Sequence, residues 1–307
     1  MTAAIAPQPR LLLVGGGGGL VGRSVLPELS PDFRIRSIHR HRAANEGAEV
    51  EWIPCDVKAV ADWSPILQDV DVILNLAWYR WESEANFRAL HDGLRRLLDA
   101  AVRCKVPRFL QVSVPPAPSS IEGALPYMVY KRRFDAALEG SGLSYRIVRP
   151  TMLFGRGDVL LGVMMRLVRR YRFFPMFGDG TYHVSPIAVS DLARVIRRES
   201  HGSEQGILDL GGPERMTYRE LTDRMFAAIG RRPRYWRISG AGARRLTGWL
   251  VAMGSTLLYP YEVEWLMSDM LGLPAYGGLD PPLRKVGPYL AELAAGKHRR
   301  PETSTSS

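Results

Sequence analysis

The feature that most constrains this chain is a run of five glycines, Gly15–Gly19, placed directly after the apolar segment Leu11–Val14. A buried strand that runs into glycines and then into a helix has the layout of a turn that cradles a dinucleotide pyrophosphate. Glycine permits the sharp bend and the close approach of the backbone, and the start of a helix favours an anion. The apolar residues on both sides of the glycines argue against a flexible linker.

These glycines satisfy two spacings of the same fingerprint. Gly17-x-Gly19-x-x-Gly22 is the standard dinucleotide-binding spacing, and Gly16-x-x-Gly19-x-x-Gly22 is a longer variant. We therefore predict a cofactor-binding turn made of Gly16, Gly19, Leu20, Val21 and Gly22.

Short apolar segments alternate with amphipathic ones, which predicts parallel β-α-β units with helices on both faces of a sheet. Strands are expected at Arg10–Val14, Arg34–His39, Val50–Pro54, Val70–Leu76, Arg108–Ser113, Tyr145–Arg149, Tyr182–Ile187 and Gly206–Leu210. Helices are expected at Glu84–Arg103, Pro126–Glu139, Asp191–Arg198 and Tyr218–Ile229, with one or two more in Ala243–Leu271. The predicted fold is α/β, a Rossmann-type doubly wound parallel sheet with a smaller C-terminal substrate lobe.

The domain boundaries follow from the same pattern. We assign residues 10–155 and about 181–200 to an NAD(P)-binding domain, and residues 156–180 and 201–295 to the substrate lobe. Residues 296–307 are basic and then rich in Ser and Thr, which predicts a disordered tail.

The end of the second strand indicates the type of cofactor. An acidic residue there accepts a hydrogen bond from the ribose 2′-hydroxyl of NAD, whereas an arginine accommodates the 2′-phosphate of NADP. The segment reads Arg36-Ser-Ile-His-Arg40-His-Arg42, without Asp or Glu. We therefore favour NADP(H) over NAD(H), with Arg40 as the first candidate contact and Arg36 as the second.

Tyr127 and Lys131 lie four residues apart and so share one face of the predicted helix Pro126–Glu139. A lysine cation near a phenol lowers the phenol pKa and can bind the nicotinamide ribose, so that the tyrosine can move the proton that accompanies hydride transfer. Tyr130 is next to Lys131 in sequence but faces another way. We predict Tyr127 as acid/base and Lys131 as its electrostatic partner.

Three aromatic residues, Trp78, Tyr79 and Trp81, follow the fourth strand, where a doubly wound sheet places its ligand crevice. We predict Trp78 and Tyr79, together with Tyr127, as substrate contacts.

The chain resembles the extended and atypical short-chain dehydrogenases/reductases, in particular the branch of NAD-dependent epimerases, NmrA-like proteins and the NADPH-binding accessory subunit of respiratory complex I. The resemblance covers about residues 10 to 230. The segments that carry it are Gly16–Gly22, Cys55–Val57, Val70–Ala77, Tyr127–Lys131, Arg149–Asp158, Phe177–Gly180, Ser185–Ala193 and Leu210–Pro213. It implies that Asp56 and Val57 contact adenine, that Leu76 and Ala77 line the cofactor cleft, and that Pro150, Met152 and Leu153 flank the nicotinamide.

One position departs from the family pattern. Family members offer a Ser or Thr just after the fifth strand to bond the substrate carbonyl. Here Ser113 aligns with the start of that serine run, and Val114 or Pro115 occupies the usual slot. Ser113 completes the predicted catalytic set, with Ser119 and Ser120 as substitutes.

The predicted activity is NAD(P)H-dependent reduction of a ketone or similar carbonyl on a small organic substrate. Two alternatives stay open: an epimerase or dehydratase acting on a sugar nucleotide, and a non-catalytic NADP(H)-binding protein, which the incomplete catalytic set favours.

Bulk properties narrow the partners. The net charge is +10, but the arginines are scattered in pairs, so we read them as a solvated surface and expect no nucleic acid. Two cysteines form no metal or redox spacing and His183 and His201 are isolated, so no metal is expected. The N-terminus does not resemble a signal peptide and no segment is long enough to span a membrane, which predicts a cytoplasmic protein, with a homodimer possible.

Overall fold

The computed structural model describes residues 8–39, 49–79, 82–158, 160–171, 173–254 and 258–296. The chain forms two compact units. The first unit holds Met1–Val114, Glu122–Arg149 and Leu192–Leu208, and the second holds Pro115–Ile121, Pro150–Asp191 and Asp209–Ser307. These boundaries differ from the predicted ones at 115–121, 150–155, 181–191 and 201–208. The assignment of cofactor and substrate to the two parts stays a prediction, and the predicted tail from 297 onward lies outside the described residues.

Up to the sixth strand, helices follow the first, fourth and fifth strands, whereas no helix is described between the second, third and fourth strands. The first part runs β1 (Arg10–Val14), α1 (Leu20–Leu29), β2 (Arg34–His39), β3 (Glu51–Pro54), β4 (Val72–Asn75), α2 (Glu84–Arg103), β5 (Arg108–Val112), α3 (Ser119–Glu122), α4 (Pro126–Glu139) and β6 (Ser144–Pro150). The second part runs β7 (Leu153–Phe154), α5 (Leu160–Arg170), β8 (Phe174–Phe177), β9 (His183–Val184), β10 (Ile187–Ala188), α6 (Val189–His201), β11 (Gly206–Leu210), β12 (Met216–Thr217), α7 (Tyr218–Ala228), β13 (Tyr235–Ile238), α8 (Gly240–Ala252), α9 (Pro260–Leu266) and α10 (Val286–Ala294).

A seven-stranded sheet has the order β11-β6-β5-β4-β1-β2-β3, and its neighbours from β6 to β3 pair in parallel. This is the doubly wound order, so the predicted fold class is confirmed. β1 lies between β2 and β4, with Val14 opposite both Ile38 and Asn75. The chain continues from β1 toward one edge of the sheet and later from β4 toward the other edge. Such a switch point is where doubly wound sheets bind their ligands, at the carboxyl ends of the strands.

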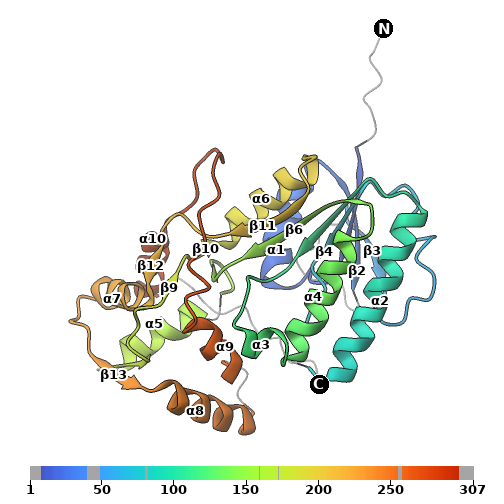
Figure 1. Cartoon of the computed structure of the whole chain (residues 1–307). Coiled ribbons are helices and arrows are strands. Elements are labelled where there is room, and N and C mark those ends of the chain that lie inside the picture. The colour runs from blue at the N-terminus through green and yellow to red at the C-terminus, as the bar shows by residue number, and fades with distance from the viewer. Residues whose placement is uncertain are drawn as a thin grey trace. The chain divides into compact units, whose positions relative to one another are not determined.

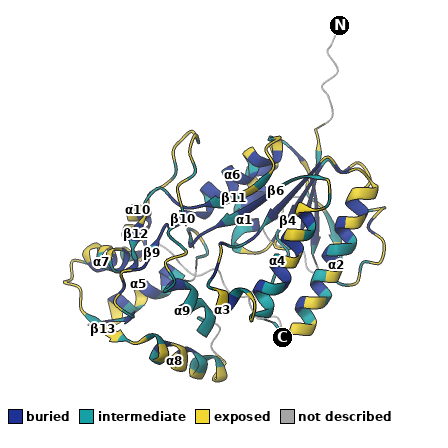
Figure 2. Cartoon of the chain, in the orientation of Figure 1, coloured by how far each residue is buried: buried dark blue, intermediate teal, exposed yellow. Residues whose placement is uncertain are grey.

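Helices α2 and α4 lie side by side over one face of this sheet (Figure 1). Their apolar stripes pack on the alternate strand residues that point to the same face, among them Leu12, Ile73, Phe109 and Ile147. The buried residues of these elements form one continuous core (Figure 2). The strongly amphipathic pattern of α2 is the reason that its predicted bounds match the observed ones.

The second unit is held by three short strand pairs and a core of its own. β7 pairs with β10, β9 with β12 and β8 with β13. Its core takes Met164, Met165, Phe226 and Leu290 from three different helices.

The single strand predicted at Tyr182–Ile187 was wrong, because the structure divides it into β9 and β10, which pair with different strands. Ser185-Pro186 separates them, and proline has no N–H to give to a ladder. The carbonyl of Pro186 instead lies against Gly212, where an added Cβ would be 1.7 Å from that oxygen.

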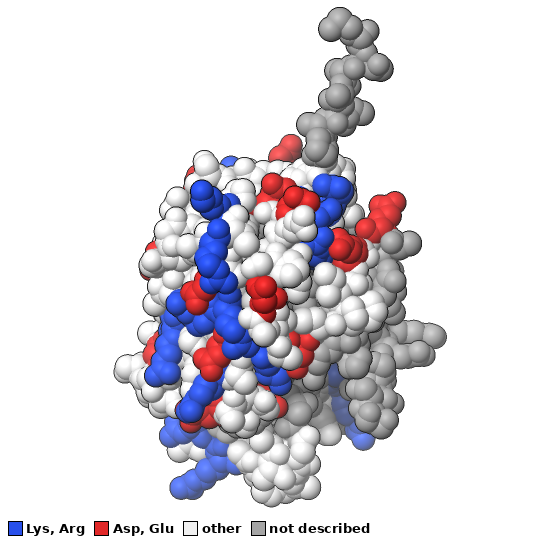
Figure 3. All heavy atoms as spheres, turned by 90° about the vertical axis from the view of Figure 1, so that its right-hand side faces the viewer, with Lys and Arg blue, Asp and Glu red and all other residues white. Residues whose placement is uncertain are grey.

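Charged side chains of both signs interleave on the face drawn in Figure 3. Along α2, Arg88 pairs with Glu84 and Arg95 with Asp99. Among the described residues, no helix combines the length and hydropathy needed to cross a bilayer. The same residues contain no group of three or more His, Cys, Asp or Glu arranged to hold a metal. Cys55 and Cys104 are free thiols.

The turn after β1 gives a stability test. In Gly22→Ala the new Cβ would stand 2.1 Å from the Gly16 carbonyl oxygen, which is backbone and cannot swing aside. We expect the free energy of unfolding in urea to fall by about 1–3 kcal/mol. The control Gly140→Ala lies in the same unit and puts its Cβ at an ordinary 3.6 Å from the nearest atom. It should change stability by less than about 0.5 kcal/mol, and equal losses in both variants would refute the steric argument.

Candidate functional site

The glycine turn is built from close backbone contacts. Gly15 and Gly16 have φ values of 67° and 71°, a region that glycine enters at little cost. The Gly19 N–H donates to the Gly16 carbonyl oxygen at 2.8 Å, which closes the turn. Gly22 packs on that same carbonyl. A Cβ would therefore clash at Gly16 and Gly22, two positions of the fingerprint, and at Gly15, which lies outside it.

The end of β4 lies directly against this turn. A Cβ at Gly15 would stand 2.6 Å from the Ala77 Cβ, and one at Gly16 would stand 2.9 Å from the Leu76 Cβ. Helix α1 begins after its N-cap residue Gly19, which has no side chain that could bond the N–H groups of the first turn. The N–H groups at this helix start therefore face no capping side chain, as an anion site requires. A tight backbone cradle without Cβ atoms fits a dinucleotide pyrophosphate.

Asn75 fixes the backbone that leads from β4 to this contact. Its Oδ1 accepts a hydrogen bond from the Ala77 N–H at 3.0 Å, and its Nδ2 donates to Gln111 Oε1 at 2.7 Å. Asn75 and Gln111 are both fully buried, so each side chain satisfies the other where water is excluded. Leu76 and Ala77 are thereby held on the turn.

Asp56 and Val57 follow β3 in a turn that α2 approaches closely. Asp56 Oδ1 accepts from the Lys58 N–H at 3.0 Å, so this carboxylate orders its own loop. A Cβ at Gly93 of α2 would stand 2.4 Å from the Val57 carbonyl oxygen. Gly93 thus lets the helix pack on the loop, and sequence reasoning missed it because a glycine inside a helix carries no distinctive signal.

Arg36 does not fit its predicted role as a cofactor contact. Its side chain is buried, donates to the Ile66 carbonyl at 2.5 Å and pairs with Glu51 at 3.1 Å. It stands inside β2 rather than at the end of the strand, and it ties the sheet to the following loop. The prediction for the 2′-phosphate therefore depends on Arg40, which lies outside the described residues.

Tyr127, Lys131 and Trp78 come together in the first unit. The Lys131 Nζ lies 4.5 Å from the centre of the Trp78 ring, in cation–π geometry. Tyr127 meets the Trp78 ring edge-on with centroids 6.4 Å apart, and it meets Phe87 of α2 at 6.2 Å. The helical spacing of four residues thus brings the predicted acid/base pair to the aromatic residue that follows Ala77.

Burial sets the protonation of Lys131. The side chain is nearly inaccessible to solvent, and this desolvation lowers its pKa to about 8, although the nearby Asp135 carboxylate opposes the shift. Lys131 is therefore charged at neutral pH but loses its proton within a range that an enzyme can use.

The other aromatic residues separate into two groups. Tyr79 packs edge-on against Phe87 at 6.2 Å and lies under Lys58, so it joins the group around Trp78. Tyr130 instead accepts a hydrogen bond from Arg88 of α2 and donates to Glu84, which confirms that it faces away from Tyr127. Trp81 lies outside the described residues. The Nε1–H of Trp78 is buried with no hydrogen-bond partner among the described residues.

Ser113 has a different partner from the one predicted. Its hydroxyl donates to Asp135 Oδ2 at 2.6 Å, and both groups are buried. The same carboxylate also meets Arg132 at 3.3 Å and Arg149 at 3.6 Å. A buried carboxylate needs such partners, so Ser113 serves this network rather than presenting its hydroxyl for a substrate carbonyl.

Asp135 itself was missed in the sequence. It lies four residues after Lys131 and eight after Tyr127, hence on the same helical face. An acidic residue on the apolar side of α4 is the signal that could have revealed it.

Pro150, Met152 and Leu153 belong to the second unit, where Met152 is buried in its core. Their placement beside a nicotinamide stays a prediction. Ser119 and Ser120, the predicted substitutes for the missing serine, also lie in the second unit, where the Ser120 hydroxyl donates to Glu264 at 2.5 Å.

The buried charge of Lys131 gives a second test. Its pKa is lowered from 10.5 to about 8 by folding, so the unfolded chain binds more protons between these values and stability rises with pH there. Below pH 8 the full penalty, about 3 kcal/mol, remains. Lys131→Met should therefore raise the free energy of unfolding in urea at pH 7 by up to about 3 kcal/mol, with less gain at pH 10.

Lys58→Met is the matched control, because Lys58 is a partly exposed lysine of the same unit that pairs with Asp56 at 3.7 Å. Its effect should stay within about 0.5 kcal/mol at both pH values. A loss of stability in Lys131→Met at pH 7 would contradict a costly buried charge.

Comparison with known proteins agrees with this geometry. Residues 16–164 match a family described as NAD(P)H-binding. A mitochondrial NADH dehydrogenase [ubiquinone] 1 alpha subcomplex subunit 9 from Arabidopsis thaliana is 29% identical over 177 residues, which cover 55% of this chain and 43% of that protein. The chloroplastic divinyl chlorophyllide a 8-vinyl-reductase of Cucumis sativus is 34% identical over 261 residues, covering 76% of this chain and 60% of the relative. The chain thus spans only about half the length of these relatives.

Solved structures share the fold. A dTDP-glucose 4,6-dehydratase from Streptomyces venezuelae, determined with NAD bound, superposes with a TM-score of 0.63 at 21% identity and covers 93% of this chain and 96% of its own. A UDP-N-acetylglucosamine 4-epimerase from Methanobrevibacter ruminantium gives a TM-score of 0.61 at 18% identity, over 75% of this chain and 86% of its own. The chain is thus similar in sequence to the complex I subunit and the vinyl reductase, and it shares the fold of the epimerase and the dehydratase.

Proposed function

We propose that this protein is an NADP(H)-dependent oxidoreductase that reduces a carbonyl on a small organic substrate, a proposal supported by the match of residues 16–164 to an NAD(P)H-binding family. The observation that carries the proposal is the meeting of Tyr127 and Lys131 at Trp78. Trp78 is the residue after Ala77, which packs on the glycine turn. Proton-transfer groups and cofactor cradle therefore adjoin each other.

The chain's own residues would hold the cofactor at the switch point of the sheet. The glycine turn and the start of α1 bind the pyrophosphate, the Asp56–Val57 loop contacts the adenine, and Arg40 pairs with the 2′-phosphate. Leu76 and Ala77 line the cleft between them. When bound, NADP(H) supplies the hydride.

Tyr127 donates the proton that neutralises the oxygen of the reduced carbonyl, and the Lys131 cation stabilises the phenolate that remains. The Trp78 face holds the ammonium of Lys131 beside Tyr127. Trp78 and Tyr79 also favour a substrate with an apolar or planar part.

A second candidate is reduction of a carbon–carbon double bond. It is favoured by the engagement of Ser113 with Asp135, which removes the usual group for orienting a carbonyl. The cucumber relative is named for the reduction of a vinyl group. Hydride delivery followed by protonation from Tyr127 would serve this reaction too.

Two further readings remain as alternatives. The solved neighbours act on sugar nucleotides by their names, so an epimerase or dehydratase reaction would use the cofactor without net consumption. A non-catalytic binding protein would hold the cofactor and lack turnover. Stoichiometric oxidation of added NADPH with a substrate distinguishes reduction from both. A cytoplasmic location stays a proposal, since the named relatives are mitochondrial and chloroplastic. A homodimer also stays a proposal.

Cofactor choice is tested by fluorescence titration of the purified protein with NADPH and NADH. Arg40→Ala should weaken NADPH binding by about 10- to 100-fold, because it removes one charge-assisted contact to the 2′-phosphate, and should leave NADH binding little changed. Arg42→Ala, two residues away, is the control and should have a smaller effect. Equal weakening of both nucleotides by Arg40→Ala would sink the assignment to NADP(H).

The catalytic assignment is tested by pH. With any carbonyl substrate that oxidises NADPH, Tyr127→Phe should lower kcat by about 100-fold or more while NADPH still binds. The kcat of the unaltered protein should fall as pH rises through about 8, because Lys131 then loses its charge. Unchanged turnover in Tyr127→Phe would refute the proposed role.

A further inference from the structure

An exposed apolar stripe runs along α8 in the second unit. Leu246, Trp249 and Met253 follow one another at helical spacing, and their exposed fractions are 37%, 60% and 67%. Large apolar side chains in a contiguous exposed row are uncommon on a protein surface unless they meet a partner.

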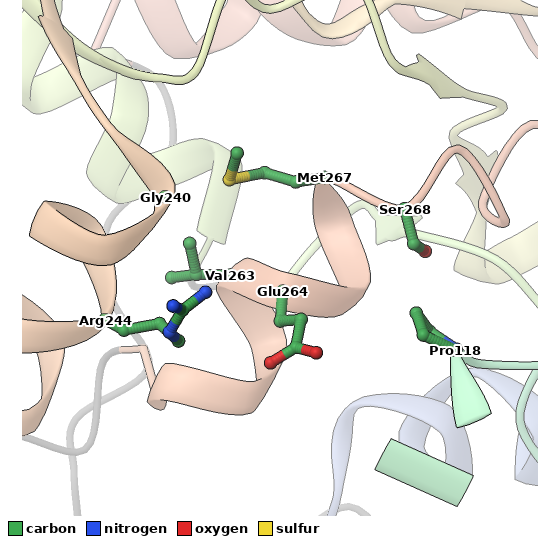
Figure 4. Close-up of a pocket in the computed structure, with 7 residues that line it drawn as sticks. All are labelled: Pro118, Gly240, Arg244, Val263, Glu264, Met267 and Ser268. Carbon is green, nitrogen blue, oxygen red and sulfur yellow. The ribbon is translucent and has the colours of Figure 1, made fainter. Parts of the chain in front are cut away.

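The opposite side of α8 already has its packing. Ala243 and Thr247 are buried beneath the helix, which packs against α9. A cavity of about 260 Å³ lies on this inner side, where Gly240 and Arg244 from the α8 end face Val263, Glu264 and Met267 of the α9 segment (Figure 4). The stripe is therefore the outer face of a helix whose inner face is satisfied.

The strand before α8 adds aromatic surface. Trp236 on β13 is 60% exposed and meets the exposed Phe173 edge-on, with ring centroids 6.0 Å apart. Only Ser239 separates β13 from α8, and the two elements follow one another along the same border of the second unit (Figure 1). We call Phe173, Trp236, Arg237, Arg245, Leu246, Trp249 and Met253 the docking surface.

The charge of this segment is of one sign. Residues 231–254 contain six arginines and neither Asp nor Glu. Arg231 caps α5 by donating to the Arg169 carbonyl at 2.9 Å, whereas Arg237 and Arg245 are exposed and adjoin Trp236 and Leu246 in the sequence. Arginines complement a partner surface that is anionic. Exposed tryptophans complement an apolar layer that lies beneath that anionic surface.

We propose that the docking surface binds the face of an anionic lipid bilayer. Helix α8 has 13 residues, so it would lie in the plane of the interface, with Trp249, Leu246 and Met253 entering the boundary between headgroups and acyl chains. Arg237 and Arg245 would pair with lipid phosphates, and tryptophan is suited to this depth. A second copy of the chain fits less well, since a self-complementary contact would set these arginines against each other.

The test is flotation of the full-length protein with vesicles of phosphatidylcholine alone or mixed with phosphatidylglycerol. The protein should float with the mixed vesicles and stay behind with the neutral ones. Trp249→Gln combined with Met253→Gln should abolish flotation, and because both side chains are exposed, the melting temperature should not change. Val102→Gln on α2, also an exposed apolar residue, is the control and should float normally.

A second pair of variants tests the charge. Arg237→Gln combined with Arg245→Gln should lower the bound fraction by about tenfold or more at low salt. Arg103→Gln combined with Lys105→Gln removes the same charge from exposed sites at the end of α2 and should have little effect. Equal loss in both pairs would reduce the binding to net charge and overturn the proposal. The proposal would also be overturned if the protein did not float with the mixed vesicles. It would likewise be overturned if the protein formed a dimer that dissociated only when Trp249 and Met253 were substituted.

Discussion

The structure of the first unit depends on one backbone contact, that of Gly22 with the Gly16 carbonyl. It lets the short glycine turn lead from β1 directly into α1, so that the helix begins at the carboxyl ends of β1 and β4. The same turn is narrow enough for Leu76 and Ala77 to pack on it. Any Cβ at these glycines would push apart the two strand ends that frame the cofactor site. The fold of this unit and the proposed cofactor site therefore both require that these glycines have no Cβ atom.

The first unit also buries a charged side chain, which costs folding stability. Lys131 is a buried cation whose burial lowers its pKa to about 8, and it is held by the Trp78 ring and by attraction to Asp135. A core residue chosen for stability would be apolar. Lys131 shares the Trp78 ring with Tyr127. Asp135, whose carboxylate attracts the Lys131 charge, is itself bound by Ser113, Arg132 and Arg149.

Much of the first unit could be predicted because its signals are local. The strands Arg10–Val14 and Arg34–His39 and the helices Glu84–Arg103 and Pro126–Glu139 agree with the observed bounds, since apolar periodicity and the flanking residues determine them. Helical spacing also placed Tyr127 and Lys131 on one face of their helix, and both contact Trp78.

The errors arose where tertiary contacts decide. Arg36 is an arginine near the end of the second strand, as a contact to the 2′-phosphate requires. The orientation of its side chain, however, depends on Glu51 and on the loop at Ile66, which no local sequence pattern reveals. Ser113 was assigned by its position after β5, while Asp135, two elements later, determines its partner. The division of Tyr182–Ile187 into two strands likewise depends on distant pairing partners.

The most direct test of this account is amide hydrogen exchange of the full-length protein, with and without NADPH. We expect NADPH to slow exchange both in the segment 16–22 and at Leu76 and Ala77, because one ligand would occupy the carboxyl ends of β1 and β4. The adjoining helix α2 serves as an internal reference and should change little. Binding of NADPH without protection of either segment would contradict the placement of the cofactor at this switch point.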